Sequence, residues 1–389
     1  MKRIIVCCDG TWQSQDNKVA TNVLKIAQAV STKDQNEIDQ TLYYDRGIGA
    51  VPDYKNQEEG REWNNFFFKT DDLIDETIIA AKRMVYPTQR MFGGIFGLGI
   101  EEKIEEAYIF LCLNYEPGDE IYMFGFSRGA YTIRSLAGLI DLCGLLQRPD
   151  INRTGEAYEI YRLRTNEQKQ QEARDFRQKY EIEKPVQIKF LGCWDTVGAL
   201  GIPNAIPWLP VDEHFKKNLK FHDNKLGSII ENARHAIAID ESRSTFEVTM
   251  MQTEENWEGS LKQVWFPGDH GCVGGGTDEI IKLPGGCELR TLDLSKTALK
   301  WMAEEAQQLG LDLDLAKASD RDLPEPNPRT IEVEPGLFQQ ERDLSKLYDR
   351  INSNDIVENF HESVMDLWCH QNYRPKNLEV VKDKLKERC

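Results

Sequence analysis

The sequence predicts an α/β fold with one mostly parallel central sheet flanked by helices. Short apolar runs of strand length alternate along the chain with segments of helical periodicity, as in strand–helix–strand units. Three of these runs end in polar clusters, DGTW at 9–12, SRG at 127–129 and WDT at 194–196, and a fourth ends in GDHG at 268–271. Ligands bind at the carboxyl ends of strands in open parallel sheets, so we expect these four clusters to converge.

A single domain is expected over residues 1–389, because α/β folds with insertions often run this long around one sheet. Residues 50–100 mix charged residues, aromatic residues and glycines without a clear period, and we interpret them as an insertion that shapes the substrate site. The elements expected in this part of the chain are strands at 3–8, 42–44 and 121–124 and helices at 17–30, 100–114 and 130–140.

The second half of the chain continues the alternation. Residues 152–184 are polar, with aromatic side chains spaced as in surface helices, and residues 200–228 form a second predicted insertion rich in proline and aromatic residues. Residues from about 336 to 389 are expected to form a helical tail. The elements expected here are strands at 186–193, 246–251 and 261–266, further apolar structure at 233–239, and helices at 291–309 and 355–368.

Ser127 is the candidate nucleophile, because it lies in a G-x-S-x-G pentapeptide between an apolar strand and an apolar-periodic helix. Such a serine projects from a sharp, strained turn where neighbouring side chains would clash, and Gly125 and Gly129 remove that obstruction. The backbone N–H of Arg128 then lies at a helix N-terminus, where it can stabilise an oxyanion. The alternative is a glycine-flanked turn with a structural role only.

A serine nucleophile needs a histidine to take its proton, and the histidine needs a carboxylate to orient it. His270 is the candidate base, because it follows a strand directly and enters a glycine-rich loop at 271–276. His361, near the last helix, is the reserve candidate. His235 lies at apparent helical spacing and is interpreted as structural, and His214 and His222 as solvated.

Asp195 is the candidate carboxylate, since the order Ser127, Asp195, His270 is the one expected of α/β hydrolases. Asp240, Asp269 and Asp278 compete with it, and a structural role of Asp195 as a turn or cap residue is the alternative reading.

The first turn, after the strand at 3–8, is expected to complete the site. The N–H of Gly10 or Thr11 can supply the second oxyanion donor. Asp9 is expected to shape this turn and, with Trp12, to border the substrate, although core packing explains Trp12 equally well.

The composition excludes several partners. A formal charge of −17 disfavours nucleic acid, which needs a basic surface, and constitutive docking on anionic lipid, although transient contact with a lipid surface is compatible with it. The nine cysteines are expected to be reduced core residues, and their spacing matches no zinc site. We expect neither a metal nor a cofactor.

The first apolar run has only five residues before Asp9, which is too short for the core of a signal peptide, and no stretch reaches the length of a membrane span. A cytoplasmic protein is therefore expected, with export by a signal-independent machine as the alternative. The sequence gives no indication of oligomeric state.

With these residues the chain resembles a known family, the α/β hydrolases of unknown function related to the catalytic domain of type VI secretion phospholipase effectors. The resemblance implies a serine hydrolase acting on ester bonds, in some relatives the acyl esters of phospholipids, with Ser127, Asp195 and His270 at the triad positions. Gly271 and Cys272 replace the serine and aspartate that commonly follow the histidine in the family. The similarity covers KRIIVCCDGTW, YDRGIG, GIEEKIEEAYIFLCLNYEPGDEIYMFGFSRGAYTIRSLAGLI, FLGCWDTVGALG, RHAIAIDESRSTF, VWFPGDHGCVGGG, HESVMDLW and NYRP.

The hypothesis from the sequence is thus a serine esterase that works through an acyl-enzyme on lipid or phospholipid acyl esters. One alternative is a carboxylesterase or thioesterase for small soluble substrates. The other is a hydrolase fold without activity, used as a binding module.

Overall fold

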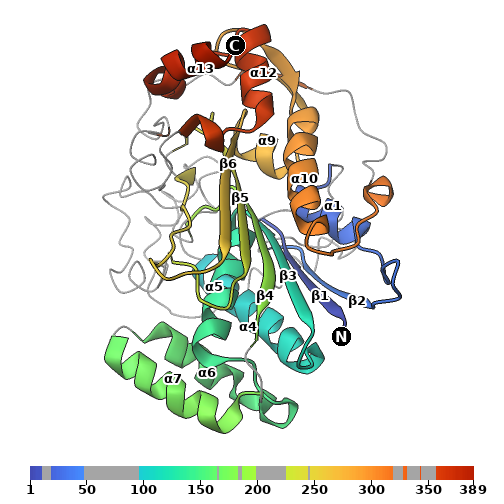
Figure 1. The fold of residues 1–389 in the computed structure, drawn as a ribbon, viewed down its shortest axis with the longest axis vertical. Helices are drawn as coiled ribbons and strands as arrows, with labels where there is room; N and C mark the ends of the chain where they lie inside the picture. Colours follow the sequence, from blue (N-terminus) through green and yellow to red (C-terminus); the bar gives the residue numbers. More distant parts are fainter. Residues whose placement is uncertain are drawn as a thin grey trace, which may run out of the picture.

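The central element of the fold is a six-stranded, fully parallel sheet, with strand order β2-β1-β3-β4-β5-β6 (Figure 1). Its strands are β1 (Arg3–Cys8), β2 (Gln40–Asp45), β3 (Glu120–Phe126), β4 (Ile188–Trp194), β5 (Asn232–Ala238) and β6 (Ser260–Phe266). This sheet and the helices around it confirm the predicted α/β architecture with one central parallel sheet. The computed structural model describes residues 1–10, 19–47, 96–163, 166–182, 186–198, 225–243, 246–318, 327–330, 342 and 356–389.

The strand order places a switch point between β1 and β3. The chain moves from β1 outward to β2, then crosses back over β1 to β3 and continues in one direction to β6. Ligands bind in open parallel sheets at such a point, beyond the carboxyl ends of the strands. The turn after β1 and the turn after β3 therefore border the expected site.

Helices cover both faces of the sheet. Each face of the sheet has its own hydrophobic core. Successive side chains of a strand point to opposite faces, so alternate residues of β1 belong to different cores. Ile4 and Val6 pack in the core with α4 (Phe96–Asn114) and α5 (Arg128–Cys143), and Ile5 packs in the core with α1 and α10. The remaining helices are α1 (Asn22–Ala29), η1 (Arg148–Arg153), α6 (Thr154–Arg162), α7 (Asn166–Tyr180), α9 (His270–Gly274), α10 (Thr291–Gln307), η3 (Leu315–Lys317), η4 (Ile356–Asn359), α12 (Glu362–His370), η5 (Lys376–Val381) and α13 (Lys382–Arg388).

A small second sheet and the C-terminal helices form a third core with the end of β6. The hairpin of β7 (Glu279–Lys282) and β8 (Glu288–Arg290) pairs with β9 (Asn327–Thr330). Figure 1 shows α12 and α13 at one end of the molecule, near α9, and α6 and α7 at the other end. The C-terminal segment thus lies near the carboxyl ends of the strands.

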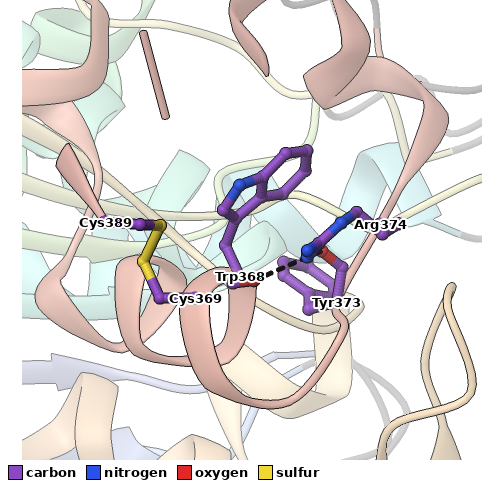
Figure 2. Close-up of a disulfide and its surroundings, with 5 residues drawn as sticks. All are labelled: Trp368, Cys369, Tyr373, Arg374 and Cys389. Carbon is purple, nitrogen blue, oxygen red and sulfur yellow. Dashed lines mark hydrogen bonds between the residues drawn. A yellow bond between two sulfur atoms is a disulfide. The ribbon is translucent and has the colours of Figure 1, made fainter. Parts of the chain in front are cut away.

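A disulfide joins Cys369 and Cys389 and links α12 to the end of α13 (Figure 2). The expectation that all nine cysteines are reduced is therefore wrong for this pair. The other seven, Cys7, Cys8, Cys112, Cys143, Cys193, Cys272 and Cys287, are buried and free as expected. Near the disulfide, the Arg374 guanidinium donates to the Trp368 carbonyl oxygen at 2.6 Å and lies over its ring.

Three local expectations differ from the structure. The segment 246–251 is not a strand, the loop expected after His270 is the short helix α9, and α1 begins only after its cap at Thr21. Most of the predicted insertions at 50–100 and 200–228 lie outside the described residues.

Candidate active site

Ser127 occupies a sharp turn between β3 and α5. Its backbone has φ 57° and ψ −119°, a conformation that non-glycine residues adopt rarely and that marks functional sites. A Cβ atom on Gly125 would lie 2.6 Å from the Gly129 carbonyl oxygen, and one on Gly129 would lie 2.0 Å from the Cys8 carbonyl oxygen. Both glycines are therefore required, because the turn is packed tightly against its own helix and against β1.

Asp195 follows the strand next to Ser127. Phe126 and Trp194 are paired in the sheet, and the Ser127 N–H donates to the Trp194 carbonyl oxygen at 3.0 Å. Asp195 is fully buried and has a φ of 39°, and its N–H donates to the Ala236 carbonyl oxygen at 2.7 Å. The sheet register thus places the serine and the aspartate at adjacent strand ends.

His270 and Asp195 are joined by a hydrogen bond. The Nδ1 atom of His270 lies 2.6 Å from Oδ2 of Asp195, which leaves the second ring nitrogen, Nε2, for another partner. Asp269 caps α9 by accepting from the Cys272 N–H at 3.1 Å, so His270 begins that helix. The His270 N–H donates to Oε2 of Glu241 at 3.2 Å. The backbone and the ring of the histidine are therefore both fixed.

Two aromatic rings border the imidazole. The ring centroid of Phe126, the residue before Ser127, lies 4.6 Å from that of His270, and Phe246 meets the imidazole edge-on at 4.7 Å. Ser127 and His270 are 4% and 6% exposed, so both lie below the surface. Among the described residues there is no hydrogen bond between Ser127 and His270. Phe126 connects the two residues, since it precedes Ser127 in the chain and its ring packs against that of His270.

Arg342 forms a two-pronged ion pair with Asp195. Its Nη1 lies 2.6 Å from Oδ1 and its Nη2 lies 2.9 Å from Oδ2, and the Ala238 N–H also donates to Oδ1 at 3.0 Å. Burial alone would raise the pKa of Asp195, but the charges of Arg342 and His270 outweigh it and hold that pKa well below its usual range. Asp195 is thus a stable carboxylate.

No local pattern in the sequence points to Arg342, which lies 147 positions after Asp195 in a charged segment. Glu241 and Phe246 were not singled out either, although both fall within the block RHAIAIDESRSTF that carries part of the resemblance. Their position after β5 was the available signal, because the ends of neighbouring strands meet at one edge of the sheet.

The first turn differs from the expectation. The Gly10 N–H donates to Oδ1 of Asp9 at 2.8 Å, so this amide already has an acceptor and the expectation that it binds an oxyanion is not supported. Asp9 is 2% exposed, and its Oδ2 accepts from the hydroxyls of Thr21 at 2.6 Å and Tyr44 at 3.0 Å. Burial raises its pKa to about 6. Asp9 therefore organises the turn, as expected, and its proposed contact with a substrate stays a prediction.

The other residues expected to border the site here are Thr11, Trp12 and Arg128. Thr11 and Trp12 lie outside the described residues. Arg128 is the first residue of α5, and first-turn amides have no acceptor within their own helix. Burial lowers the pKa of the Arg128 side chain to about 10. Gly10 nevertheless lies beside Ser127, since a Cβ atom on it would be 3.3 Å from that of Ser127.

The described competing histidines have other roles. His235 belongs to β5, not to a helix, and its Nε2 accepts from the Thr196 N–H at 3.0 Å. Burial lowers its pKa to about 3, so it is a neutral structural residue. His361 caps α12 by accepting from the Ser363 N–H and stacks on Phe266. His214 and His222 lie outside the described residues.

The competing aspartates also have partners elsewhere. Asp240 accepts from the Gly268 N–H at 2.7 Å and from the Tyr373 hydroxyl at 2.6 Å, so it supports the segment that leads to His270. Asp278 pairs with Arg290 through both oxygens. Of the aspartates considered, Asp195 is therefore the one that contacts His270.

No cluster of three or more His, Cys, Asp or Glu side chains that could hold a metal ion occurs in the described ranges. None of the helices in those ranges combines the length and the apolar character that a bilayer span requires.

Comparison with known proteins gives one family. The model for the T6SS phospholipase effector Tle1-like catalytic domain matches residues 2–305, a segment that ends before Arg342. The uncharacterized protein YEL023C of Saccharomyces cerevisiae is 29% identical over 253 residues, which is 63% of this chain. The match spans only 32% of the yeast protein, about a third of its length.

Two solved structures are similar at low identity. One is an uncharacterized protein from Pseudomonas aeruginosa, with 19% identity and a TM-score of 0.40 over 82% of this chain and 47% of that one. The other is the Tle1 effector bound to the VgrG spike of the type 6 secretion system, with 14% identity and a TM-score of 0.41 over 80% of this chain and 74% of that one.

Proposed function

This chain belongs to the family of Tle1-like catalytic domains of type VI secretion phospholipase effectors, and we propose that it hydrolyses carboxylic esters through an acyl-enzyme formed on Ser127. The family supports hydrolase activity on lipid esters. The proposed substrates are accordingly lipid or phospholipid acyl esters. The proposed triad is Ser127, His270 and Asp195.

The hydrogen bond between His270 and Asp195 carries this proposal. At 2.6 Å it fixes the imidazole so that Nδ1 holds the proton shared with the carboxylate and Nε2 is a free base. Ser127 directly follows the neighbouring strand, β3, and its strained backbone holds the hydroxyl at the start of α5. Nucleophile, base and carboxylate thus come from three adjoining elements.

In the acylation step, the Oγ atom of Ser127 attacks the ester carbonyl carbon while its proton passes to Nε2 of His270. The carbonyl π electrons move to oxygen, and the proposed donors to this oxyanion are the N–H of Arg128 and, since the Gly10 amide is occupied, that of Thr11. The tetrahedral species collapses, the bond to the leaving alkoxide breaks, and His270 returns the proton to give the alcohol.

In the deacylation step, water takes the place of the alcohol. His270 removes a proton from the water, the resulting hydroxide attacks the acyl carbon, and the second tetrahedral species expels Ser127, which regains its proton from His270. The products are a carboxylic acid and the free enzyme. Asp195 stays ionised throughout and stabilises the imidazolium.

Covalent labelling tests the nucleophile. Wild type incubated with a fluorophosphonate is expected to gain the mass of one adduct on Ser127, and Ser127→Ala to gain none. Ser135→Ala, at a buried serine of the same helix, is the matched control and should label like wild type. A folded wild-type protein that does not label overturns the proposal and favours the inactive binding module.

A substrate panel tests the ester class. Rates on phospholipid in mixed micelles and on a short-chain soluble ester are measured for wild type and Ser127→Ala. Hydrolysis of the phospholipid at the higher kcat/KM, lost in the alanine variant, is the expected result. A reversed preference would assign the protein to the soluble carboxylesterases or thioesterases.

A further inference from the structure

Resting on the proposed serine-hydrolase chemistry, we propose that Arg342 is a positioning residue that fixes the orientation of Asp195 and limits how much of its negative charge acts on His270. Nothing in the family match covers this residue, since the match ends at 305. The carboxylate of the proposed triad is therefore shared between a base and a permanent cation.

Four hydrogen bonds from the two terminal nitrogens of Arg342 orient its guanidinium. Besides the two oxygens of Asp195, its Nη1 donates to the Ala238 carbonyl oxygen and its Nη2 to the Phe246 carbonyl oxygen, both at 2.7 Å. The side chain is 6% exposed. A planar guanidinium that pairs with both oxygens of a carboxylate fixes the rotation of that carboxylate as well as its position.

One side chain thus contacts both the proposed acid and the backbone of a residue whose ring lies beside the proposed base. Phe246, whose carbonyl oxygen accepts from Arg342, meets the His270 ring at 4.7 Å. Removing Arg342 would free the carboxylate of Asp195 to rotate away from Nδ1 and would also loosen Phe246. Both changes would act on the imidazole.

The other charges near the pair partly balance each other. Arg243 pairs with Glu241 through two contacts of 2.8 and 2.6 Å, and Glu241 also accepts from the His270 N–H. Asp269, the N-cap residue of α9, is a further negative charge that favours the charged form of Arg243. His235, on β5, is neutral. Arg342 is therefore the cation in direct contact with Asp195.

The sharing of charge has a kinetic consequence. A carboxylate normally favours the imidazolium form of the triad histidine, whereas a guanidinium on the same carboxylate opposes that form. Loss of the guanidinium is therefore expected to move the acid limb of the labelling profile to higher pH. A purely structural ion pair would affect stability without moving the pH profile.

The test compares wild type with Arg342→Gln and Arg342→Lys. The rate constant for fluorophosphonate labelling of Ser127 is measured from pH 4.5 to 9, with circular dichroism to verify folding. Arg234→Gln is the matched control, because Arg234 forms an equally buried pair with Glu305 away from the site.

We expect the acid limb of the Arg342→Gln profile to move up by about one pH unit or more, with a maximal rate at least tenfold lower. Arg342→Lys keeps the charge but loses the planar fork, so its acid limb should stay within a few tenths of a unit of wild type while its maximal rate falls. The profile of Arg234→Gln should coincide with that of wild type.

The inference is overturned if folded Arg342→Gln labels with the profile and rate of Arg234→Gln. Should the glutamine variant fail to fold, Arg342→Lys decides: a wild-type rate and profile in that variant refutes the positioning role. Absence of labelling in folded wild type overturns the proposed function, and this inference with it. That result is distinct from unchanged Arg342 variants of an active wild type.

Discussion

Replacing Gly129 with alanine adds a methyl group that would overlap backbone atoms at the end of β1. The added Cβ would lie 2.0 Å from the carbonyl oxygen and 2.5 Å from the carbonyl carbon of Cys8, and 2.6 Å from the carbonyl oxygen of Asp9. These atoms belong to a buried central strand, so they cannot rotate away as a side chain would. The start of α5, which carries Ser127, must move instead.

The displacement gives the magnitude. Unstrained carbon contacts begin near 3.5 Å, so the helix start must shift by more than about 1 Å. Overpacking of this kind costs about 1–3 kcal/mol, of which the better helix propensity of alanine recovers up to about 1 kcal/mol. A displacement of about 1 Å in a reacting group reduces the rate by about 100-fold. Activity should therefore fall much further than stability.

The assay is fluorophosphonate labelling of Ser127 together with urea unfolding. Gly155→Ala is the matched control, since Gly155 lies exposed on α6 with no atom within 4 Å of its added Cβ. That variant should label at the wild-type rate and be neutral or up to about 1 kcal/mol more stable. Wild-type labelling and stability in Gly129→Ala would refute the packing argument.

Three further predictions concern the histidines, a buried acid and the disulfide. His270→Ala should reduce the labelling rate of Ser127 by at least about 1000-fold. His361→Ala should label at the wild-type rate and lose about 1 kcal/mol of stability, because it removes the cap of α12. The opposite result would exchange the roles of the two histidines. Burial raises the pKa of Asp240 to about 6, so the native state keeps a proton that the unfolded state releases near pH 4. The stability difference between wild type and Asp240→Asn in urea should therefore fall by about 2 kcal/mol as pH rises from 4 to 6, and a rise would contradict the assignment. Cys369→Ser removes the disulfide to Cys389, which closes a loop of 20 positions, and should lower the free energy of unfolding in urea by about 3 kcal/mol. In dithiothreitol the variant and wild type should be equally stable. A wild-type protein with the same stability with and without dithiothreitol would refute this prediction.

The sequence predicts the strands that are buried on both faces. β1, β3 and β4 read as continuous apolar runs because helices cover both sides of a parallel sheet. The same runs locate Ser127 and Asp195, since each follows its strand directly. Chain order and strand position together select His270 for the contact with Asp195.

The sequence pattern predicts a strand incorrectly where apolar side chains are buried without strand pairing. Residues 246–251 resemble a strand, and Val248, Met250 and Met251 are buried. Their backbone is bonded largely by side chains: Arg134 donates to the Thr249 and Met250 carbonyl oxygens, and Gln263 bonds both backbone groups of Met251. A polar side chain elsewhere thus replaces the neighbouring strand, which no local pattern can indicate.

The occupied Gly10 amide and Arg342 were also beyond prediction, for different reasons. An aspartate side chain readily accepts from the next amide in a turn, and this local bond competes with a role in catalysis. Arg342 is brought to Asp195 by long-range folding, and its own neighbours in the sequence show no periodic pattern.

Asp195 and Arg342 are 147 positions apart in the chain, so the ribosome synthesises them at different times. A ribosome adds about 5–20 residues per second, so the carboxylate is synthesised about 7–30 s before its cationic partner. Throughout that interval a nascent chain contains the proposed nucleophile and, later, the proposed base, but not the guanidinium that pairs with Asp195. The proposed arrangement of Ser127, His270 and an oriented Asp195 therefore cannot form before residue 342 has been synthesised.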